Sequence, residues 1–445
     1  MTQPDLDLLA NLVALARRAG ADAADALLVE GISLSVGRRL GKLEGVNRSE
    51  GRDLGLRVFV GKRQATVSST DFGRQALQAV ADRAIAMARA APEDPYCGLA
   101  DGDDLARAFP DLDLEDAEEP SPERLTAMAA AAEDAALAVK GVSNSEGADA
   151  GWGRGRTYMV ASNGFAGGYG GTSSSIGASV LAGGGDAMER DYDGASTRFL
   201  ADLPDPAAIG RSAGERAVRR LGARKVKTAK VPVVYDPRIS RGLLGHLAGA
   251  ISGPAIARGT SFLKDRLGKP VFAPPIRVTD DPHRRRGLRS RPFDGEGVRN
   301  RAIDLVDGGV LTTWLLDCRS ARQLGLRSTG HASRGTSGVP SPGTTNLYLH
   351  AGALTPAALM ADIAEGFYVT ELIGMGVSLV TGDYSRGAAG FWIENGTITY
   401  SVSEVTIAGK LPDMFRAMTP ADDLVFRYGT DAPTIRVDGM TVAGL

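Results

Sequence analysis

"DALLVEGISLSVGRRLGKLEGVNRSEGRDLGLRVFVGKRQATVSST", residues 25–70, alternates apolar and polar residues between turns that contain glycine. A period of two places successive side chains on opposite faces of a strand, and glycine permits the backbone conformations of tight turns. The stretch therefore predicts a β-meander. Residues 4–19 before it and 73–91 after it have the apolar spacing of amphipathic helices. The N-terminal part of the chain is therefore predicted to be α+β.

The middle of the chain starts after an acidic segment interrupted by proline, residues 92–120, which is typical of a linker. Ser121 is a predicted helix N-cap because Pro122 follows it at the first helical position. The Gly-rich stretch 143–200 predicts short strands between turns, forming a second sheet. A further helix is predicted at 206–221.

The C-terminal half is predicted to be mostly β, with one helix that contains His246 directly after a strand at 231–237. Further strands are expected at 302–309, 310–317, 344–350, 376–382, 388–402 and 405–409. The fold class is therefore α+β throughout. We place the domains at residues 1–115, 116–229 and 230–445.

Composition excludes several classes of protein. The formal charge of −2 over 445 residues argues against bulk attraction to nucleic acid or to an anionic membrane. Two cysteines, Cys97 and Cys318, make neither a disulfide framework nor a thiolate metal cage. The first 20 residues lack the pattern of a signal peptide, and we find no apolar run of the roughly 18 residues that would span a bilayer. We therefore expect a cytoplasmic protein.

Three short motifs suggest chemistry, but none has all the features that its functional class requires. The Gly-rich stretches at 151–156 and 167–172 match neither a P-loop nor a dinucleotide fingerprint. The basic run 281–292 lacks interleaved aromatic residues and is typical of a solvated loop. Ser261 and Lys264 fit the S-x-x-K pattern of serine nucleophiles, but the supporting elements of that class are absent. We interpret all three as structural.

The helix "RISRGLLGHLAGAISG", residues 238–253, raises the question of a metal site. A catalytic metal needs three or four converging ligands and an acid–base group nearby. His246 stands alone there, because no acidic residue occurs from Ile239 to Ser252. We interpret His246 as a packed, hydrogen-bonded residue.

Much longer patterns occupy the C-terminal half: "FDGEGV" at 293–298, "GVLTTWLLDCRSARQLGLRSTGHASRG" at 309–335, the block 367–415, and "VDGMTVAGL" at the end. Together they resemble the TldD/PmbA family, in its PmbA branch, also called TldE. The resemblance extends over essentially the whole chain. It implies a three-segment α+β fold and a role in cytoplasmic proteolysis.

The resemblance also implies that two different chains have different roles in one assembly. TldD-like chains carry an HExxxH motif that binds zinc, and TldE-like chains pair with them in an assembly, a heterodimer or larger, that admits unfolded peptides. The corresponding positions here are Leu244, Gly245 and Gly249, aligned on "RGTS" at 258–261, and no ligand survives at them. We therefore assign no catalytic residue, metal or cofactor to this chain and expect zinc in a TldD-like partner. Our hypothesis for Gly245 and Gly249 is close packing.

A peptide is expected to bind as an added strand where missing side chains let its backbone approach a sheet edge. The candidate segment is "TGDYSRGAAG", 381–390, with Gly382, Asp383, Tyr384, Ser385, Arg386 and Gly387 as contacts; a tight turn in a core hairpin is the alternative. Two other functions stay open. One is a hydrolase with an unrecognised nucleophile, and the other is a homodimeric peptide-binding or regulatory protein that acts alone.

Overall fold

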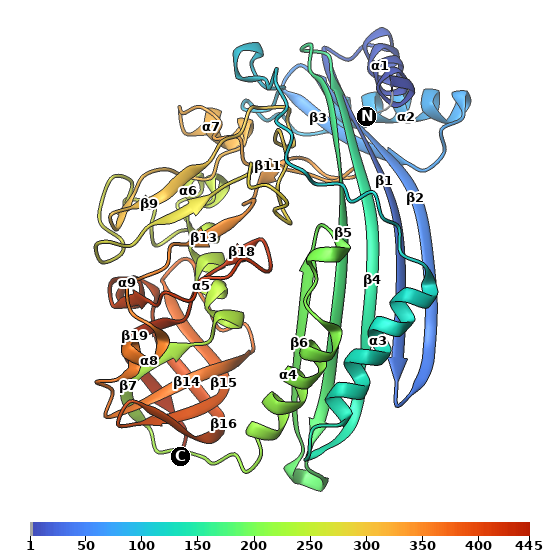
Figure 1. Ribbon diagram of the computed structural model, residues 1–445. Coiled ribbons are helices and arrows are strands. Elements are labelled where there is room, and N and C mark those ends of the chain that lie inside the picture. The colour runs from blue at the N-terminus through green and yellow to red at the C-terminus, as the bar shows by residue number, and fades with distance from the viewer. Residues whose placement is uncertain (1–2) are drawn as a thin grey trace.

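The computed structural model describes residues 3–445, apart from the side chain of Asp186. An elongated N-terminal sheet with its helices stands beside a more compact C-terminal half (Figure 1). The N-terminal half contains helices α1 (Gln3–Arg18), α2 (Arg74–Ala90), α3 (Pro122–Leu137) and α4 (Pro206–Arg219), and strands β1 (Ala23–Arg39), β2 (Lys42–Val60), β3 (Arg63–Ser69), β4 (Val142–Ala161), β5 (Ala166–Ala182) and β6 (Glu189–Thr197).

The six N-terminal strands form one antiparallel sheet in the order β3-β2-β1-β4-β5-β6. The meander is confirmed, but the prediction of short strands in a separate second sheet is wrong. β4 has 20 residues, and its residues 148–161 pair with β1. Many of the glycines lie within strands and do not mark turns. Gly31, Gly155 and Gly171 stand opposite one another on three neighbouring strands.

The helices close two separate apolar cores on this sheet. α1 and α2 cover one end, with Leu9, Leu12 and Ile85 in the core. α3 and α4 cover the other end, around Leu125 and Trp152. The predicted cap of α3 is confirmed, because the Ser121 hydroxyl accepts a hydrogen bond from the Arg124 amide.

The C-terminal half contains helices α5 (Pro237–Ala250), α6 (Gly253–Ala257), α7 (Cys318–Gln323), α8 (Pro356–Met360) and α9 (Leu411–Arg416). Its strands are β7 (Ala229–Tyr235), β8 (Val278–Asp280), β9 (Ile303–Asp307), β10 (Val310–Leu311), β11 (Ala332–Ser333), β12 (Ser341–Pro342), β13 (Leu347–Leu349), β14 (Glu365–Ile373), β15 (Asp383–Glu394), β16 (Thr397–Lys410), β17 (Met418–Pro420), β18 (Thr430–Asp431) and β19 (Ile435–Ala443).

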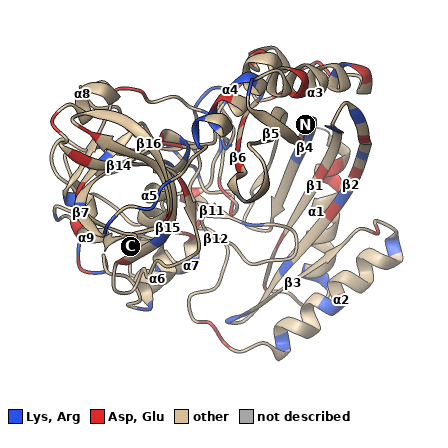
Figure 2. Cartoon of the chain, turned by 90° about the horizontal axis from the view of Figure 1, so that it is seen from below, with Lys and Arg blue, Asp and Glu red and all other residues tan. Residues whose placement is uncertain are grey.

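Five of these strands close into a small barrel in the order β16-β15-β14-β7-β19, since β19 also pairs with β16. Figure 2 shows this barrel end-on as a ring of strands beside the long sheet. A second sheet, β10-β9-β8-β13-β18, lies next to the barrel, and α5 connects the two by packing Leu243, Leu244 and Leu247 into their shared core.

The strand predicted at 376–382 is wrong. This segment is a turn that folds back on the start of β15, because Gly374 and Gly382 adopt positive φ angles of 81° and 79° and break the extended backbone. The strand predicted at 310–317 is limited to β10. Among the described helices, none is long and apolar enough to cross a membrane.

Candidate functional site

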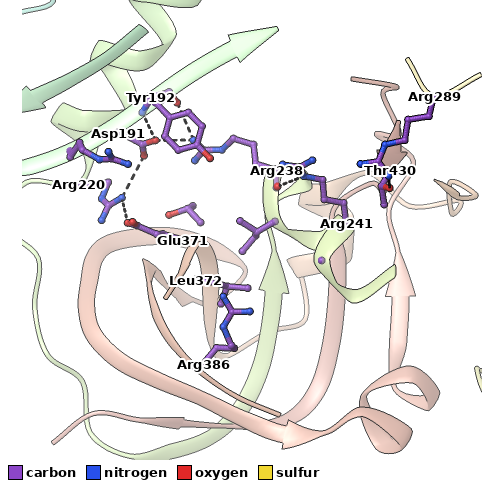
Figure 3. A pocket seen from close by; sticks show the side chains of 14 residues that line it. Asp191, Tyr192, Arg220, Arg238, Arg241, Arg289, Glu371, Leu372, Arg386 and Thr430 are labelled. Atoms are coloured by element: carbon purple, nitrogen blue, oxygen red, sulfur yellow. Dashed lines mark hydrogen bonds and ion pairs between the residues drawn. The ribbon is translucent and has the colours of Figure 1, made fainter. Parts of the chain in front are cut away.

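A cavity of about 520 Å³ lies where the long sheet, α5 and the barrel meet (Figure 3). β6 contributes Asp191 and Tyr192 to its wall, and the N-terminal half of α5 contributes Arg238 and Arg241. The barrel contributes Glu371 and its neighbours from β14 and Arg386 from β15. The cavity therefore lies between the middle and C-terminal parts of the chain.

Ion pairs tie the walls of the cavity together. The Arg238 guanidinium donates to an Asp191 carboxylate oxygen at 2.8 Å and to the Tyr192 carbonyl oxygen at 3.2 Å. The Arg220 guanidinium lies 2.6 Å from a Glu371 carboxylate oxygen and 3.8 Å from one of Asp191. Burial lowers the pKa of Arg238, but Asp236 and Asp191 outweigh burial and hold that pKa above its usual value. These contacts join the sheet to the barrel side of the cavity.

Helix α5 carries a stripe of one arginine and three glycines on this side. The Asp236 carboxylate caps its first turn by accepting from the Arg238 amide, and Pro237 fits the first helical position. At about 100° per residue, Arg238, Gly242, Gly245 and Gly249 fall on one face of the helix. Gly242 and Gly245 are exposed, and a Cβ atom on either would meet nothing within 4 Å.

The positions of the degenerate metal motif divide between two faces of the helix. Leu244 is buried in the core with 1% exposure. Gly245 is open, whereas a Cβ atom on Gly249 would lie 2.7 Å from the Leu379 side chain of the same chain. The close packing expected of these glycines therefore occurs within the chain at Gly249, and Gly245 is left open. None of the three offers a ligand atom on its side chain.

His246 packs edge-on against Tyr384, with ring centroids 5.9 Å apart. Burial, and then the positive charge of Arg386, lower the pKa of His246 and favour the neutral ring. Across residues 3–445, the described side chains include no group of three or more His, Cys, Asp or Glu that could hold a metal ion. The residues around α5 therefore do not fit a catalytic zinc ion.

The segment proposed to bind peptide has no free backbone edge in this structure. Residues 383–387 pair with β16 on one side. On the other side the Ser385 amide donates to Gly376 and the Asp383 carbonyl accepts from Ser378. Both backbone edges of 382–387 are occupied by the chain itself, so a peptide could add as a strand there only by displacing these contacts.

The side chains of residues 382–387 lie in different environments and do not form one surface. Tyr384 is 2% exposed, and Asp383 pairs with Lys410 at 2.7 Å. Gly382 needs its positive φ and would clash with Pro412 if it carried a Cβ atom. Of the six proposed residues, Arg386 alone lines the cavity. The arginines of α5 were not predicted, although their spacing of three in the sequence places Arg238 and Arg241 on one helix face.

The other short motifs are structural. The Ser261 hydroxyl is buried, donates to the Ala250 carbonyl at 2.6 Å and accepts from the Leu263 amide. Both hydrogen bonds are local, and no hydrogen bond joins Ser261 to Lys264 in the described part of the chain. In the basic run, Arg286 pairs with Asp113 of the linker and with Asp202, which follows β6.

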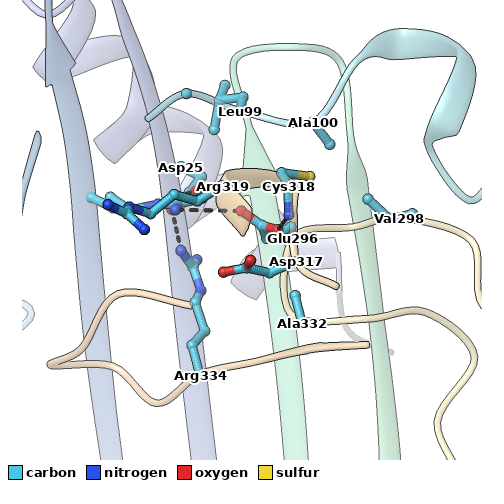
Figure 4. Close-up of polar contacts among 12 residues, drawn as sticks. Asp25, Leu99, Ala100, Glu296, Val298, Asp317, Cys318, Arg319, Ala332 and Arg334 are labelled. Carbon is cyan, nitrogen blue, oxygen red and sulfur yellow. Dashed lines mark hydrogen bonds and ion pairs between the residues drawn. The ribbon is translucent and has the colours of Figure 1, made fainter. Parts of the chain in front are cut away.

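A second charge cluster lies inside the junction between the long sheet and the loops before β11. The Arg57 guanidinium donates twice to Asp25, at 3.0 and 2.5 Å, and lies 3.6 Å from Glu296. Arg334 binds the other Asp25 oxygen at 2.6 Å. Figure 4 shows Asp25, Arg334, Glu296 and Cys318 gathered here. Burial, with Glu296 and Asp294, raises the pKa of the Cys318 thiol, so this cysteine is not a reactive thiolate.

This cluster predicts a pH dependence of stability. Burial and the Glu296 charge raise the pKa of Asp294 to about 7. A carboxyl group with a raised folded pKa stabilises the fold most below its unfolded pKa, and this contribution is lost as pH rises through the folded value. The contribution of Asp294 to stability should therefore decrease from pH 5.5 to 7.5, by roughly 2 kcal/mol at about 1.4 kcal/mol per pH unit, measured as the difference between thermal melts of the unmutated chain and of Asp294→Asn. A difference that does not vary with pH would contradict the assignment to Asp294.

Solved structures share this architecture over the whole chain. A Bacteroides thetaiotaomicron protein titled a putative modulator of DNA gyrase superposes with a TM-score of 0.92 at 28% identity, covering 100% of both chains. TldE from Thermococcus kodakarensis superposes with a TM-score of 0.89 at 20% identity, covering 98% of this chain and 100% of that chain, which shows the shared fold. The chain therefore has the α+β fold of these two solved structures.

Sequence relatives identify the family within that fold. The Escherichia coli O157:H7 protein named Metalloprotease PmbA is 40% identical over 95% of this chain and 92% of its own length. A Haemophilus influenzae protein named Metalloprotease PmbA homolog is 37% identical over 97% of this chain and 94% of its own length. Models for domain 1, the central domain and the C-terminal domain of PmbA/TldA metallopeptidases match residues 24–88, 115–221 and 228–444. The chain belongs to the PmbA/TldD metallopeptidase family.

Proposed function

We propose that this chain is the non-zinc-binding, TldE-like subunit of a two-component cytoplasmic metallopeptidase that acts on unfolded peptides. A TldD-like partner would supply the metal, and this chain would supply walls and peptide contacts. The observation that carries the proposal is the α5 stripe. Where a metallopeptidase helix would present ligands, this helix has Gly245 and Gly249, which offer no ligand atom, and its Arg238, Arg241 and Gly242 line the adjacent cavity.

The outer edge of β6 is our proposed place for strand addition, in place of 382–387. β6 ends the six-stranded sheet, and within residues 3–445 no other strand pairs with its outer edge. Side chains occupy the edge instead. Asp191 accepts from the Tyr192 amide at 2.8 Å, Asp193 accepts from the Gly194 amide at 2.9 Å, and Arg238 donates to the Tyr192 carbonyl. A peptide backbone can replace such contacts with ladder hydrogen bonds.

Tyr192→Pro tests this edge. The Tyr192 amide points away from β5, so proline removes an outward donor without removing a ladder hydrogen bond, a position that edge strands tolerate. We expect about fivefold weaker binding of an unfolded peptide than in Tyr192→Ala, since one hydrogen bond contributes about 1 kcal/mol. Fluorescence anisotropy measures the affinity, and matched melting temperatures establish that both variants are folded. Equal affinities would show that the edge is not used.

Reconstitution tests the proposed function as a whole. The purified chain is mixed with a TldD-like chain, and assembly is followed by light scattering while a labelled unfolded peptide reports cleavage. We expect cleavage by the mixture that exceeds the sum of the separate chains. A chain that binds peptide but neither assembles with the partner nor changes its cleavage would instead support the stand-alone peptide-binding protein.

A further inference from the structure

The cavity beside β6 has a strong excess of positive charge. Six arginines line it, against two carboxylates, Asp191 and Glu371. The arginines are Arg190, Arg220, Arg238, Arg241, Arg289 and Arg386. Arg220 and Arg238 are matched to the two carboxylates by the ion pairs described above. The remaining charge is therefore not balanced within the cavity.

Three of these arginines have no acidic partner. Among the described residues, no carboxylate lies within ion-pair distance of Arg241, Arg289 or Arg386. The Arg241 guanidinium lies 4.0 Å from the centre of the Tyr428 ring and donates to the Arg238 carbonyl at 3.1 Å. Arg386 donates to the Ile373 carbonyl at 3.3 Å, and Arg289 donates to the Thr430 hydroxyl at 3.4 Å. These neutral contacts position the guanidinium groups and leave their charges available.

The three groups come from separate parts of the chain and converge on one space. Arg241 lies on α5, Arg386 on β15, and Arg289 on the loop between β8 and β9. Figure 3 shows all three around the same cavity. Arginine binds carboxylates through two parallel hydrogen bonds, so several converging guanidinium groups favour a planar anion over an isolated neutral group.

We propose that this cavity binds a carboxylate group of a peptide, either its free C-terminus or an acidic side chain. The inference rests on the proposed function only in that the ligand is a peptide. It adds a chemical preference: a peptide lying along β6 would have its acidic group drawn into the cavity beside the glycine stripe of α5. The guanidinium groups act here as binding residues, and no bond is made or broken.

The test compares four labelled unfolded peptides of one sequence by fluorescence anisotropy on the isolated full-length chain. They carry a free or an amidated C-terminus, each with internal glutamate or glutamine. If the C-terminus is the ligand, amidation weakens binding about tenfold; if the side chain is the ligand, the glutamine peptide binds about tenfold more weakly. Equal binding of all four peptides, or no binding of any, would overturn the proposal.

Variants assign the effect to the cavity. Arg241→Gln and Arg386→Gln should each reduce the preference for the carboxylate, whereas Arg83→Gln on the exposed face of α2 should leave it unchanged. Phenylglyoxal modification of the unmutated chain, mapped by mass spectrometry, gives a readout that does not depend on the variants folding. The preferred peptide should slow modification of Arg241 and Arg386, and its neutral counterpart should not. Unaltered modification with the preferred peptide bound would place its carboxylate elsewhere.

The outcome is separable from that of the reconstitution experiment. Carboxylate-dependent binding by the isolated chain would stand even if no TldD-like chain assembled with it. Conversely, reconstituted cleavage with no carboxylate preference would leave the proposed function intact and remove this inference.

Discussion

Replacing Arg57 with methionine is expected to lower the free energy of unfolding by about 3–5 kcal/mol, because it removes the cation that two buried carboxylates share. Arg57 is 3% exposed and contacts Asp25, which is fully buried, and Glu296, which is 3% exposed. Burial raises the pKa of Asp25, but Arg334 and Arg57 outweigh burial and keep that pKa below its usual value. Chemical denaturation followed by circular dichroism measures the loss.

Arg52→Met on the same strand is the matched control. Arg52 forms ion pairs with Asp5 and Glu30, but its side chain is 46% exposed. Exposed ion pairs contribute about 0–1 kcal/mol, so this variant should remain close to the parent. Similar losses in the two variants would contradict the assignment of Arg57 to the junction between sheet and C-terminal half.

Gly210→Ala is expected to destabilise the chain by about 3 kcal/mol, although alanine is the better helix former. Gly210 lies on α4 where it crosses α3, and an added Cβ atom would lie 1.8 Å from the Ala132 carbonyl oxygen. Because the obstacle is backbone, no rotamer change relieves it, and the two helices must move apart. The melting temperature and the denaturation midpoint should both fall.

Gly245→Ala is expected to have the opposite effect on stability. This glycine also lies within a helix, but a Cβ atom on it meets nothing within 4 Å. Alanine should therefore stabilise α5 by about 0.5–1 kcal/mol through reduced backbone entropy in the unfolded chain. Destabilisation by Gly245→Ala in the isolated chain would mean that the stripe is not open.

Local patterns in the sequence predicted the elements better than their assembly. The alternation in 25–70, the Ser121 cap and the helix around His246 all depend on neighbouring residues, and the structure contains each of them. The joining of β4 to β1 depends on pairing across more than 100 residues. In the Gly-rich stretch the sequence has few side chains to indicate which face or partner a strand takes. The extent of the sheet was therefore not predictable from local periodicity.

The candidate site shows the same division. The sequence shows that Leu244, Gly245 and Gly249, the positions that we aligned with the metal motif, carry no ligand, and α5 forms as an uninterrupted helix over them. The residues that surround α5 could not be predicted, because Asp191 and Glu371 come to the cavity from strands far away in the sequence. The prediction at 381–390 included Arg386 but rested on a free backbone edge, and that edge is paired on both sides.

The most direct test of the account measures zinc and peptide cleavage by the isolated chain after saturation with zinc and removal of the excess. We predict no stoichiometric zinc, no cleavage of an unfolded peptide, and zinc that stays with the TldD-like chain when the two are mixed and then separated. About one zinc ion per isolated chain, with cleavage that a chelator abolishes, would contradict the account. In that case the ligands would lie outside the α5 stripe.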